Sequence, residues 1–194
     1  MKLSAKTPIN PTDASYFSEG SPLLHQSFAE QGKIYFLEEK FDLALKYFRY
    51  SLELAVQTES PEFLIKHYLE CLLEALEMTG NYQAVIAYCD RFISLVEQED
   101  FNAERQIYLA QVFQKKGIIL IKSGKKEEGQ NYLDQASKLA VSGKFPLLLT
   151  ENILFLLNSG IIPNKKRILE EQKQTGYFFI NPKNVNKEIA LQIK

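Results

Sequence analysis

The sequence predicts an all-α protein, and three observations support this fold class. Apolar residues recur at helical spacing through most of the 194 residues. Proline, glycine and small polar residues divide this pattern into segments of helix length. No stretch alternates apolar and polar residues over the length of a strand. The predicted organisation is an irregular arm over 1–20, a helical array over 21–142, capping helices over 143–175 and an irregular tail over 176–194.

Helix boundaries follow from the residues that start and stop helices. The predicted helices cover about 22–38, 41–57, 61–78, 82–97, 102–122, 127–141, 146–158 and 165–174. Ser60 is the expected N-cap of the third helix, Asp100 or Asn102 that of the fifth, and Asn164 that of the last. Gly80 suits the left-handed conformation that ends a helix.

Composition limits the classes of partner. The net charge is -1, with 45% hydrophobic and 24% charged residues, which is typical of a soluble globular protein. No basic excess favours nucleic acid or an anionic membrane. No stretch reaches the roughly 18 apolar residues that span a bilayer, and the first twenty residues lack the apolar region of a signal peptide. We therefore expect a cytoplasmic protein, with Cys71 and Cys89 as reduced core thiols.

One stretch, GKIYFLEEKFDLALKYFRYSLELA, shares its register with two later stretches. Counting from Gly32, Leu73 and Gly117, the positions at offsets 3, 9, 12, 16 and 19 are mostly apolar or small, and a helix-ending turn falls at the same place. Two antiparallel helices approach closely where small residues face each other, as Ala44 and Gly129 would face the two glycines. Each hairpin leaves one apolar face open, so the three are expected to stack.

This pattern resembles the tetratricopeptide repeat (TPR), whose signature has Gly and Tyr in the first helix and Ala, Phe or Tyr, and Ala in the second. The stretch from Gly32 matches best, that from Gly117 matches fairly, and that from Leu73 matches weakly because Leu73 and Val85 replace small residues. The starts lie 41 and 44 residues apart, against about 34 in the standard repeat. The resemblance implies a right-handed superhelical array of about three elongated hairpins, followed by C-terminal capping helices.

The resemblance also implies a function. In TPR proteins the first helix of each hairpin lines a concave groove, so we expect a protein–protein interaction scaffold or adaptor that binds a partner peptide or helix there. A peptide-sensing regulatory protein or a secretion-type chaperone is the alternative. The expected partner-binding residues are Lys33, Phe36, Leu37, His67, Glu70, Glu74, Glu77, Gln111 and Gln114. The three glutamates share one helix face, which either pairs with basic partner residues or is simply solvated.

The sequence carries no catalytic motif. No G-x-S-x-G turn presents a nucleophile, no glycine-rich loop cradles a phosphate, and neither His25 nor His67 has a second ligand at metal spacing. We expect no enzyme, metal or cofactor. Two apolar features stay open: the segment 146–162 either caps the array or forms a homodimer surface, and the aromatic residues 177–179 dock on the array or on a partner.

Overall fold

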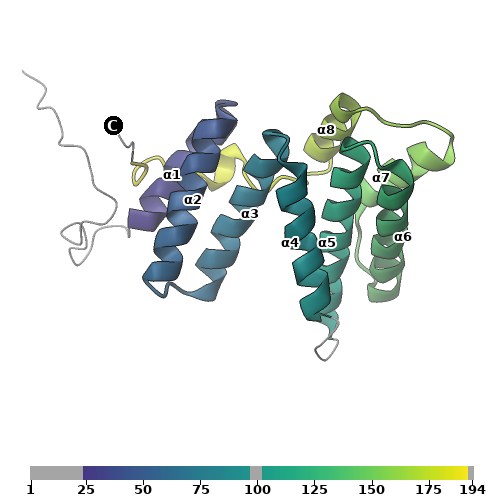
Figure 1. Cartoon of the computed structure of the whole chain (residues 1–194), viewed down its shortest axis with the longest axis horizontal. Coiled ribbons are helices and arrows are strands. Elements are labelled where there is room, and N and C mark those ends of the chain that lie inside the picture. The colour runs from purple at the N-terminus through teal and green to yellow at the C-terminus, as the bar shows by residue number, and fades with distance from the viewer. Residues whose placement is uncertain (1–23, 97–101, 192–194) are drawn as a thin grey trace, which may run out of the picture. The chain divides into compact units, whose positions relative to one another are not determined.

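The computed structural model of the chain describes residues 24–96 and 102–191, and these residues form helices and no strand. The helices are α1 (Leu24–Leu37), α2 (Phe41–Gln57), α3 (Glu62–Met78), α4 (Tyr82–Val96), α5 (Ala103–Lys122), α6 (Lys126–Gly143), α7 (Leu148–Asn158), α8 (Lys165–Gln174) and the 3-10 turn η2 (Pro182–Asn184) (Figure 1). The chain divides into two compact units. Unit 1 contains α1–α3 with the chain from Phe179 onward, and unit 2 contains α4–α8 and ends at Phe178.

Two of the predicted helix caps are confirmed. The side chain of Asn102 caps α5, where its Oδ1 accepts a hydrogen bond from Arg105 N at 2.9 Å. The side chain of Asn164 caps α8 in the same way, accepting from Arg167 N at 2.8 Å. Both asparagines satisfy backbone donors that the first turn of a helix leaves without a carbonyl partner. The alternative cap at Asp100 and the predicted start of the first helix lie outside the described residues.

Other predicted boundaries are wrong. Ser60 does not cap α3, whose N-cap is Pro61 without a side-chain hydrogen bond, because the Ser60 hydroxyl bonds a buried imidazole instead. The apolar helix begins at Leu148 rather than at Pro146. Lys144 adopts a left-handed conformation as the C-cap of α6, and Phe145 N donates a hydrogen bond to the carbonyl oxygen of Ala140 in that helix. Because Lys144 and Phe145 still belong to the end of α6, the next helix begins only after Pro146.

The three predicted repeat turns share one backbone conformation. Glu39, Gly80 and Gly124 each lie seven positions after a repeat start, and their φ angles are 58°, 75° and 90°. Left-handed backbone suits glycine, and a non-glycine residue there costs about 1–2 kcal/mol. Glu39 nevertheless adopts it. The turn geometry is therefore shared even where the sequence lacks the residue that favours it.

Unit 1 is built around the close approach of α1 and α2, which lie side by side in Figure 1. A Cβ atom on Gly32 would lie 2.7 Å from Cε1 of the fully buried Phe48. Glycine is therefore needed at position 32, but the group that lies closest to it is the Phe48 ring and not Ala44, the partner that the sequence predicts. Helix α3 packs against α2, and Ala29, Ala55 and Tyr68 form a core shared by the three helices.

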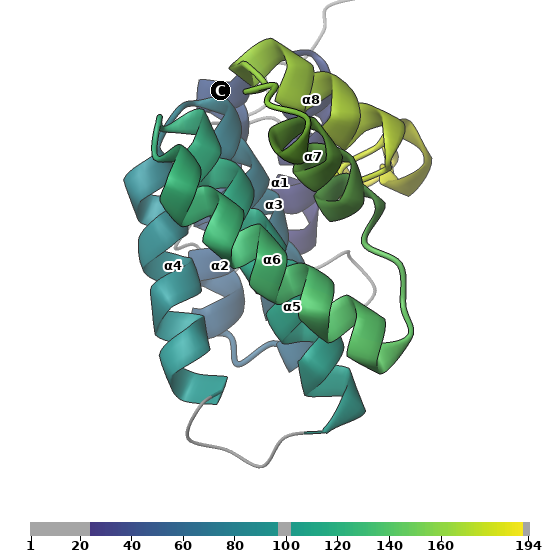
Figure 2. The ribbon, with the colours of Figure 1, turned by 90° about the vertical axis from the view of Figure 1, so that its right-hand side faces the viewer.

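Unit 2 repeats this arrangement in α5 and α6, which run side by side in Figure 2. A Cβ atom on Gly129 would lie 2.7 Å from the carbonyl oxygen of Gly117, so the two backbones touch at this point. The close contact predicted between Gly117 and Gly129 of the third hairpin is thus confirmed, whereas the pairing of Gly32 with Ala44 in the first hairpin stays a prediction. The middle hairpin would pair α3 with α4, which belong to different units, and it stays a prediction.

The apolar segment 146–162 is buried on one side. Leu149 and Ile153 of α7 lie in a core with residues of α5, α6 and α8. On the other side of α7, Leu148 and Phe155 are exposed, Phe155 to 71%. The helix therefore caps unit 2 and also keeps an open apolar face. The homodimer surface stays a prediction.

Candidate functional site

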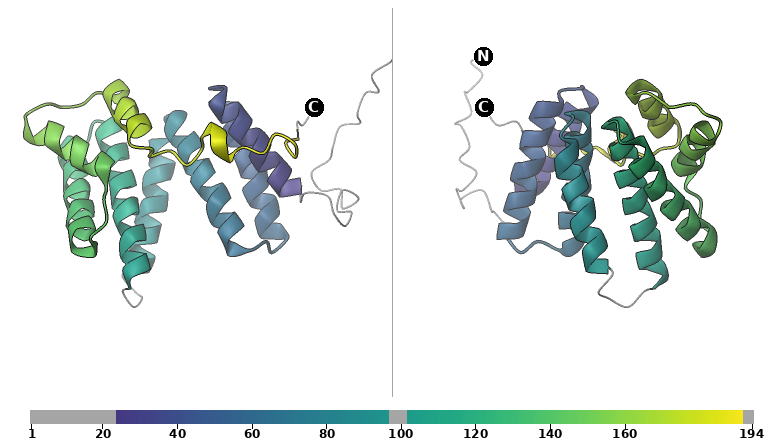
Figure 3. Two further views of the ribbon diagram at one scale, coloured as in Figure 1. Left: turned by 180° about the vertical axis from the view of Figure 1, so that it is seen from behind. Right: turned by 45° about the vertical axis from the view of Figure 1, so that its right-hand side comes forward.

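The end of the described chain lies along two helices of unit 1. Residues 179–191, called the tail below, first cross α3 and then follow α1 (Figures 1 and 3). Along α1 the tail contacts Lys33, then Glu30, and ends where Leu191 N donates to the carbonyl oxygen of Ser27 at 3.2 Å. It therefore runs antiparallel to α1. The helix face predicted to bind a partner is occupied by a segment of the same chain.

On α3, Glu74 holds the start of the tail. Its side chain is only 4% exposed, and its two carboxylate oxygens accept hydrogen bonds from Phe179 N at 2.5 Å and from Ile180 N at 3.1 Å. The Phe179 ring packs edge-on against His67, with 4.6 Å between the ring centroids. A buried carboxylate is costly unless donors surround it, and the tail main chain supplies two.

On α1, Lys33 and Glu30 hold the middle of the tail. Lys33 is 2% exposed, and its ammonium donates to Glu30 Oε1 at 2.8 Å and to the carbonyl oxygen of Asn184 at 3.0 Å. The second carboxylate oxygen of Glu30 accepts from Asn186 N at 2.7 Å. The ion pair thus offers one donor and one acceptor to a polypeptide backbone, and the tail uses both.

The tail forms its own turn between these two anchor points. Asn181 Oδ1 accepts from Lys183 N at 3.0 Å, Asn184 Oδ1 accepts from Asn181 N at 3.1 Å, and Pro182 begins the turn. The side-chain amides of both asparagines donate to the carbonyl oxygen of Phe179. The turn presents the Asn184 carbonyl to the lysine on α1.

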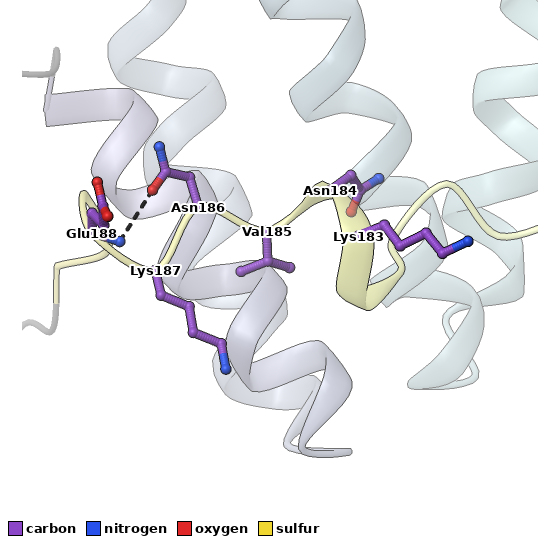
Figure 4. A pocket seen from close by; sticks show the side chains of 6 residues that line it. All are labelled: Lys183, Asn184, Val185, Asn186, Lys187 and Glu188. Atoms are coloured by element: carbon purple, nitrogen blue, oxygen red, sulfur yellow. Dashed lines mark hydrogen bonds between the residues drawn. The ribbon is translucent and has the colours of Figure 1, made fainter.

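An open pocket follows this turn, but it belongs to the tail itself. It is lined by the six consecutive residues 183–188 (Figure 4). One hydrogen bond, from Glu188 N to Asn186 Oδ1 at 3.1 Å, closes the chain on one side. The lining comes from one continuous segment, and no α-helix contributes a side chain to it. The pocket is therefore a bend of the tail and does not gather side chains from different elements around a ligand.

The remaining predicted residues of unit 1 have mixed surroundings. Phe36 packs against Phe41, with 5.3 Å between ring centroids, so it serves the α1–α2 contact. Leu37 is exposed at the end of α1. Glu70 is partly buried on α3, and Glu77 is buried near its end. Of the nine predicted residues, the tail therefore brings three together, on neighbouring helices.

The two predicted residues of unit 2 lie in a different setting. Gln111 is exposed on α5. Gln114 is buried, and its Oε1 accepts from Thr150 Oγ1 at 2.8 Å and from Thr150 N at 3.2 Å. Further along α5, Lys122 donates to Gln172 of α8 at 2.7 Å. The predicted groove face of α5 is thus partly covered by the capping helices.

Sequence reasoning missed two anchor residues on α1. Glu30 and Ser27 lie three and six residues before Lys33, a spacing that places them on one side of the helix. The pairing of Glu30 with Lys33 at i,i+3 was visible in the sequence. The contact of Ser27 was not, because it uses the main-chain carbonyl, which every residue possesses.

A second histidine of unit 1, His25, is buried and forms hydrogen bonds that connect helices. His25 Nδ1 lies 2.8 Å from Tyr68 Oη, and its Nε2 lies 3.0 Å from Ser60 Oγ. Burial lowers the pKa of His25, which favours the neutral ring. The Ser60 hydroxyl also bonds Thr58 Oγ1 at 3.0 Å. In a catalytic triad a carboxylate orients the histidine, whereas here the phenol of Tyr68 occupies that place. We interpret the cluster as a link between α1, the α2–α3 loop and α3.

Metal sites, membrane spans and reactive thiols are three further features for which the described residues were compared with known requirements of each. Within residues 24–96 and 102–191, no three His, Cys, Asp or Glu side chains are grouped so that they could hold a metal ion. No helix in the described part of the chain is long and apolar enough to cross a membrane. Both cysteines are buried thiols, and burial raises the pKa of Cys71 well above its usual value.

No family model, curated protein or solved structure matches this chain. The contacts between the tail and the α1/α3 face are therefore the basis for a functional proposal.

Acidification is expected to loosen the tail through His67. Burial, and then the positive charge of Lys33, lower the pKa of His67 to about 4, while Glu30 offsets part of the shift. Without the tail, the ring is less buried and its pKa moves back toward the usual 6.5. The released state therefore binds more protons, so falling pH favours release between about 6.5 and 4.

Amide hydrogen exchange measures this effect. We expect the protection factors of the Phe179 and Ile180 amides to fall by about tenfold between pH 7 and pH 5. The charged and titratable groups around the ring are Lys33 and Glu30 on α1 and Tyr68 on α3. His67→Gln should flatten the pH dependence. An equal fall in this variant would assign the effect to another group.

Proposed function

We propose that this chain is a protein-interaction module that binds a peptide segment on the α1/α3 face. The observation that carries the proposal is a set of hydrogen bonds to the main chain of residues 179–184. They come from Glu74 and Lys33, two buried residues of opposite charge on neighbouring helices. Main-chain groups occur in any polypeptide, so the same donors and acceptors suit a segment of another protein. Peptides are often held by their main chain, with side-chain contacts giving specificity.

We further propose that the helices form a TPR-like array. The glycine contacts of the first and third hairpins and the common turn conformation support it. The hairpin of α5 and α6 covers 103–143, which is longer than the standard repeat of about 34 residues and supports elongated repeats. In such an array, α1 and α3 are the first helices of successive hairpins, the position that binds partners in that family.

The proposal narrows the expected binding residues. Lys33, His67 and Glu74 form its centre, and Glu30 is added to them because it binds the tail backbone. Gln114 is set aside, since it bonds to the start of α7. The scaffold function thus rests on a compact set of residues in unit 1.

Selection of displayed peptides tests this proposal on the immobilised full chain carrying Ile180→Ser, a change at a buried tail residue that weakens the hold of the tail on the face and leaves the face open to the peptides. We expect enriched peptides whose binding falls at least tenfold with Glu74→Gln, because the variant removes the charge that strengthens both hydrogen bonds. Glu62→Gln is the matched control: Glu62 lies on the same helix, in an exposed ion pair with Lys66 at 2.9 Å. Peptides that bind both variants equally, or no enrichment at all, would contradict a binding site on this face.

A further inference from the structure

We propose that the tail is a built-in competitor for the α1/α3 face. It occupies the face until a partner segment with the same chemistry displaces it: an aromatic residue, a large aliphatic residue and then Asn-Pro-x-Asn, as in Phe179–Asn184. This inference rests on the proposed function, because it identifies the ligand class and the regulation of the same site.

The tail is attached in a way that permits release. It is joined to α1 and α3 by hydrogen bonds between residues that lie 105 to 164 positions apart in the sequence, and it contributes no α-helix to unit 1. Phe179 is 41% exposed although its ring contacts His67. Ile180, at 4% exposure, is the deeply buried side chain of the anchor region. Segments with few buried apolar contacts open locally at a fraction of the global free energy of unfolding.

The buried charges decide what a competing segment must provide. Once the tail leaves, Glu74 loses two N–H donors and Lys33 loses a carbonyl acceptor. A competing segment that replaces these hydrogen bonds avoids the cost of losing them, so the tail is displaced most readily by a backbone that supplies the same donors and the same acceptor. Glu74 accepts from two consecutive residues, and the chain bends at Phe179 so that both N–H groups point to the same carboxylate, because consecutive N–H groups of an extended strand point in opposite directions.

Side chains of the tail then set the specificity. The first position carries an aromatic ring against His67, and the second carries a buried aliphatic side chain at Ile180. Asn181 and Asn184 close the turn that brings a carbonyl to Lys33. A segment without the two asparagines would have to order this turn at a cost in conformational entropy.

Competition within one chain sets a threshold for the partner. A segment tethered by a short flexible connection has an effective concentration in the millimolar range. A separate peptide of equal intrinsic affinity, present at micromolar concentration, therefore loses to the tail. A partner must bind more tightly, through contacts beyond the shared motif, or be locally concentrated.

Fluorescence anisotropy with a labelled peptide of residues 176–191 tests the proposal on the full chain. Ile180→Ser removes the buried aliphatic anchor from the resident tail, and we expect it to bind the peptide at least tenfold more tightly than the wild type. Lys183→Ser is the matched control, since it makes the same new residue at an exposed tail position, and it should bind like the wild type. Adding Glu74→Gln to Ile180→Ser should weaken binding about tenfold.

Each other outcome overturns the proposal. Equal binding by the wild type and Ile180→Ser would show that the tail does not occlude the face, and no binding by Ile180→Ser would show that the face does not accept the segment from outside. A wild-type dimer in light scattering that dissociates with Ile180→Ser would make a second copy the occupant.

If Ile180→Ser fails to fold by circular dichroism, Phe179→Ala, at the partly exposed position, should give a smaller change in the same direction.

The proposed function and this inference fail separately. Displayed peptides that need Glu74 while the tail peptide does not bind would leave the interaction module intact and remove the competitor. Loss of both signals would remove the site.

Discussion

Replacing Phe48 by alanine should lower the free energy of unfolding by about 3–5 kcal/mol, the usual cost of deleting a buried phenylalanine side chain. Phe48 is fully buried, and its ring lies where a side chain on Gly32 would otherwise begin. Phe63→Ala is the matched control, because Phe63 lies on α3 of the same unit and is 68% exposed. Its loss should be below about 1 kcal/mol. Urea unfolding followed by circular dichroism measures both.

A double-mutant cycle tests whether the ring and the glycine form one contact. Gly32→Leu alone should destabilise by about 1–3 kcal/mol, because its Cβ atom would lie 2.7 Å from the Phe48 ring. In the Phe48→Ala background the leucine occupies the vacated space. The double variant should therefore be more stable than the sum of the single losses predicts, by at least about 1 kcal/mol. Strict additivity would show that the two positions do not share the space.

Gly129→Val should destabilise unit 2 by about 3 kcal/mol or more, the upper range for overpacking. A Cβ atom at this position would lie 2.7 Å from the Gly117 carbonyl oxygen and 2.6 Å from Ile121 Cγ1. A backbone oxygen cannot rotate away as a side chain can, so α5 and α6 would have to move apart. This movement would disturb the apolar packing between the two helices. The measurement is again urea unfolding, with the unfolding midpoint compared between variants.

Glu127→Val is the control for this substitution. Glu127 is exposed two residues earlier in the same helix, so valine there carries the lower helix propensity of a β-branched residue without the backbone clash. We expect a loss of at most about 1 kcal/mol. Equal midpoints for the two valine variants would contradict the close approach of the backbones.

Local features were predictable because the residues that determine them lie close together in the sequence. Asparagine caps bond to an amide three residues ahead, as Asn102 and Asn164 do. Left-handed turn residues follow from the shared repeat register, which placed even Glu39 in the position that glycine fills elsewhere. Ser60 shows where such reasoning ends. Its sequence context suits an N-cap, but His25, distant in sequence, takes its hydroxyl in the folded chain.

The sequence also placed Lys33, His67 and Glu74 on one predicted binding face, because helix spacing and the repeat register determine which side a residue occupies. It left open whether the aromatics at 177–179 dock on the array or on a partner. In the structure these aromatic residues pack at different places: Tyr177 packs on the core of unit 2, and Phe179 packs on His67 of α3. Local sequence contains no signal for a hydrogen bond to a main-chain amide 105 positions away.

The sequence by itself thus determined the helices of the described residues, their turns and the hairpin positions that require glycine, since each depends on neighbouring or regularly spaced residues. Only the tertiary structure decided which predicted surfaces stay open. On α5, Gln114 bonds to the capping helix α7. On α1 and α3, the buried charges of Lys33 and Glu74 are satisfied by the tail, because two charged groups removed from water need partners and this chain supplies its own.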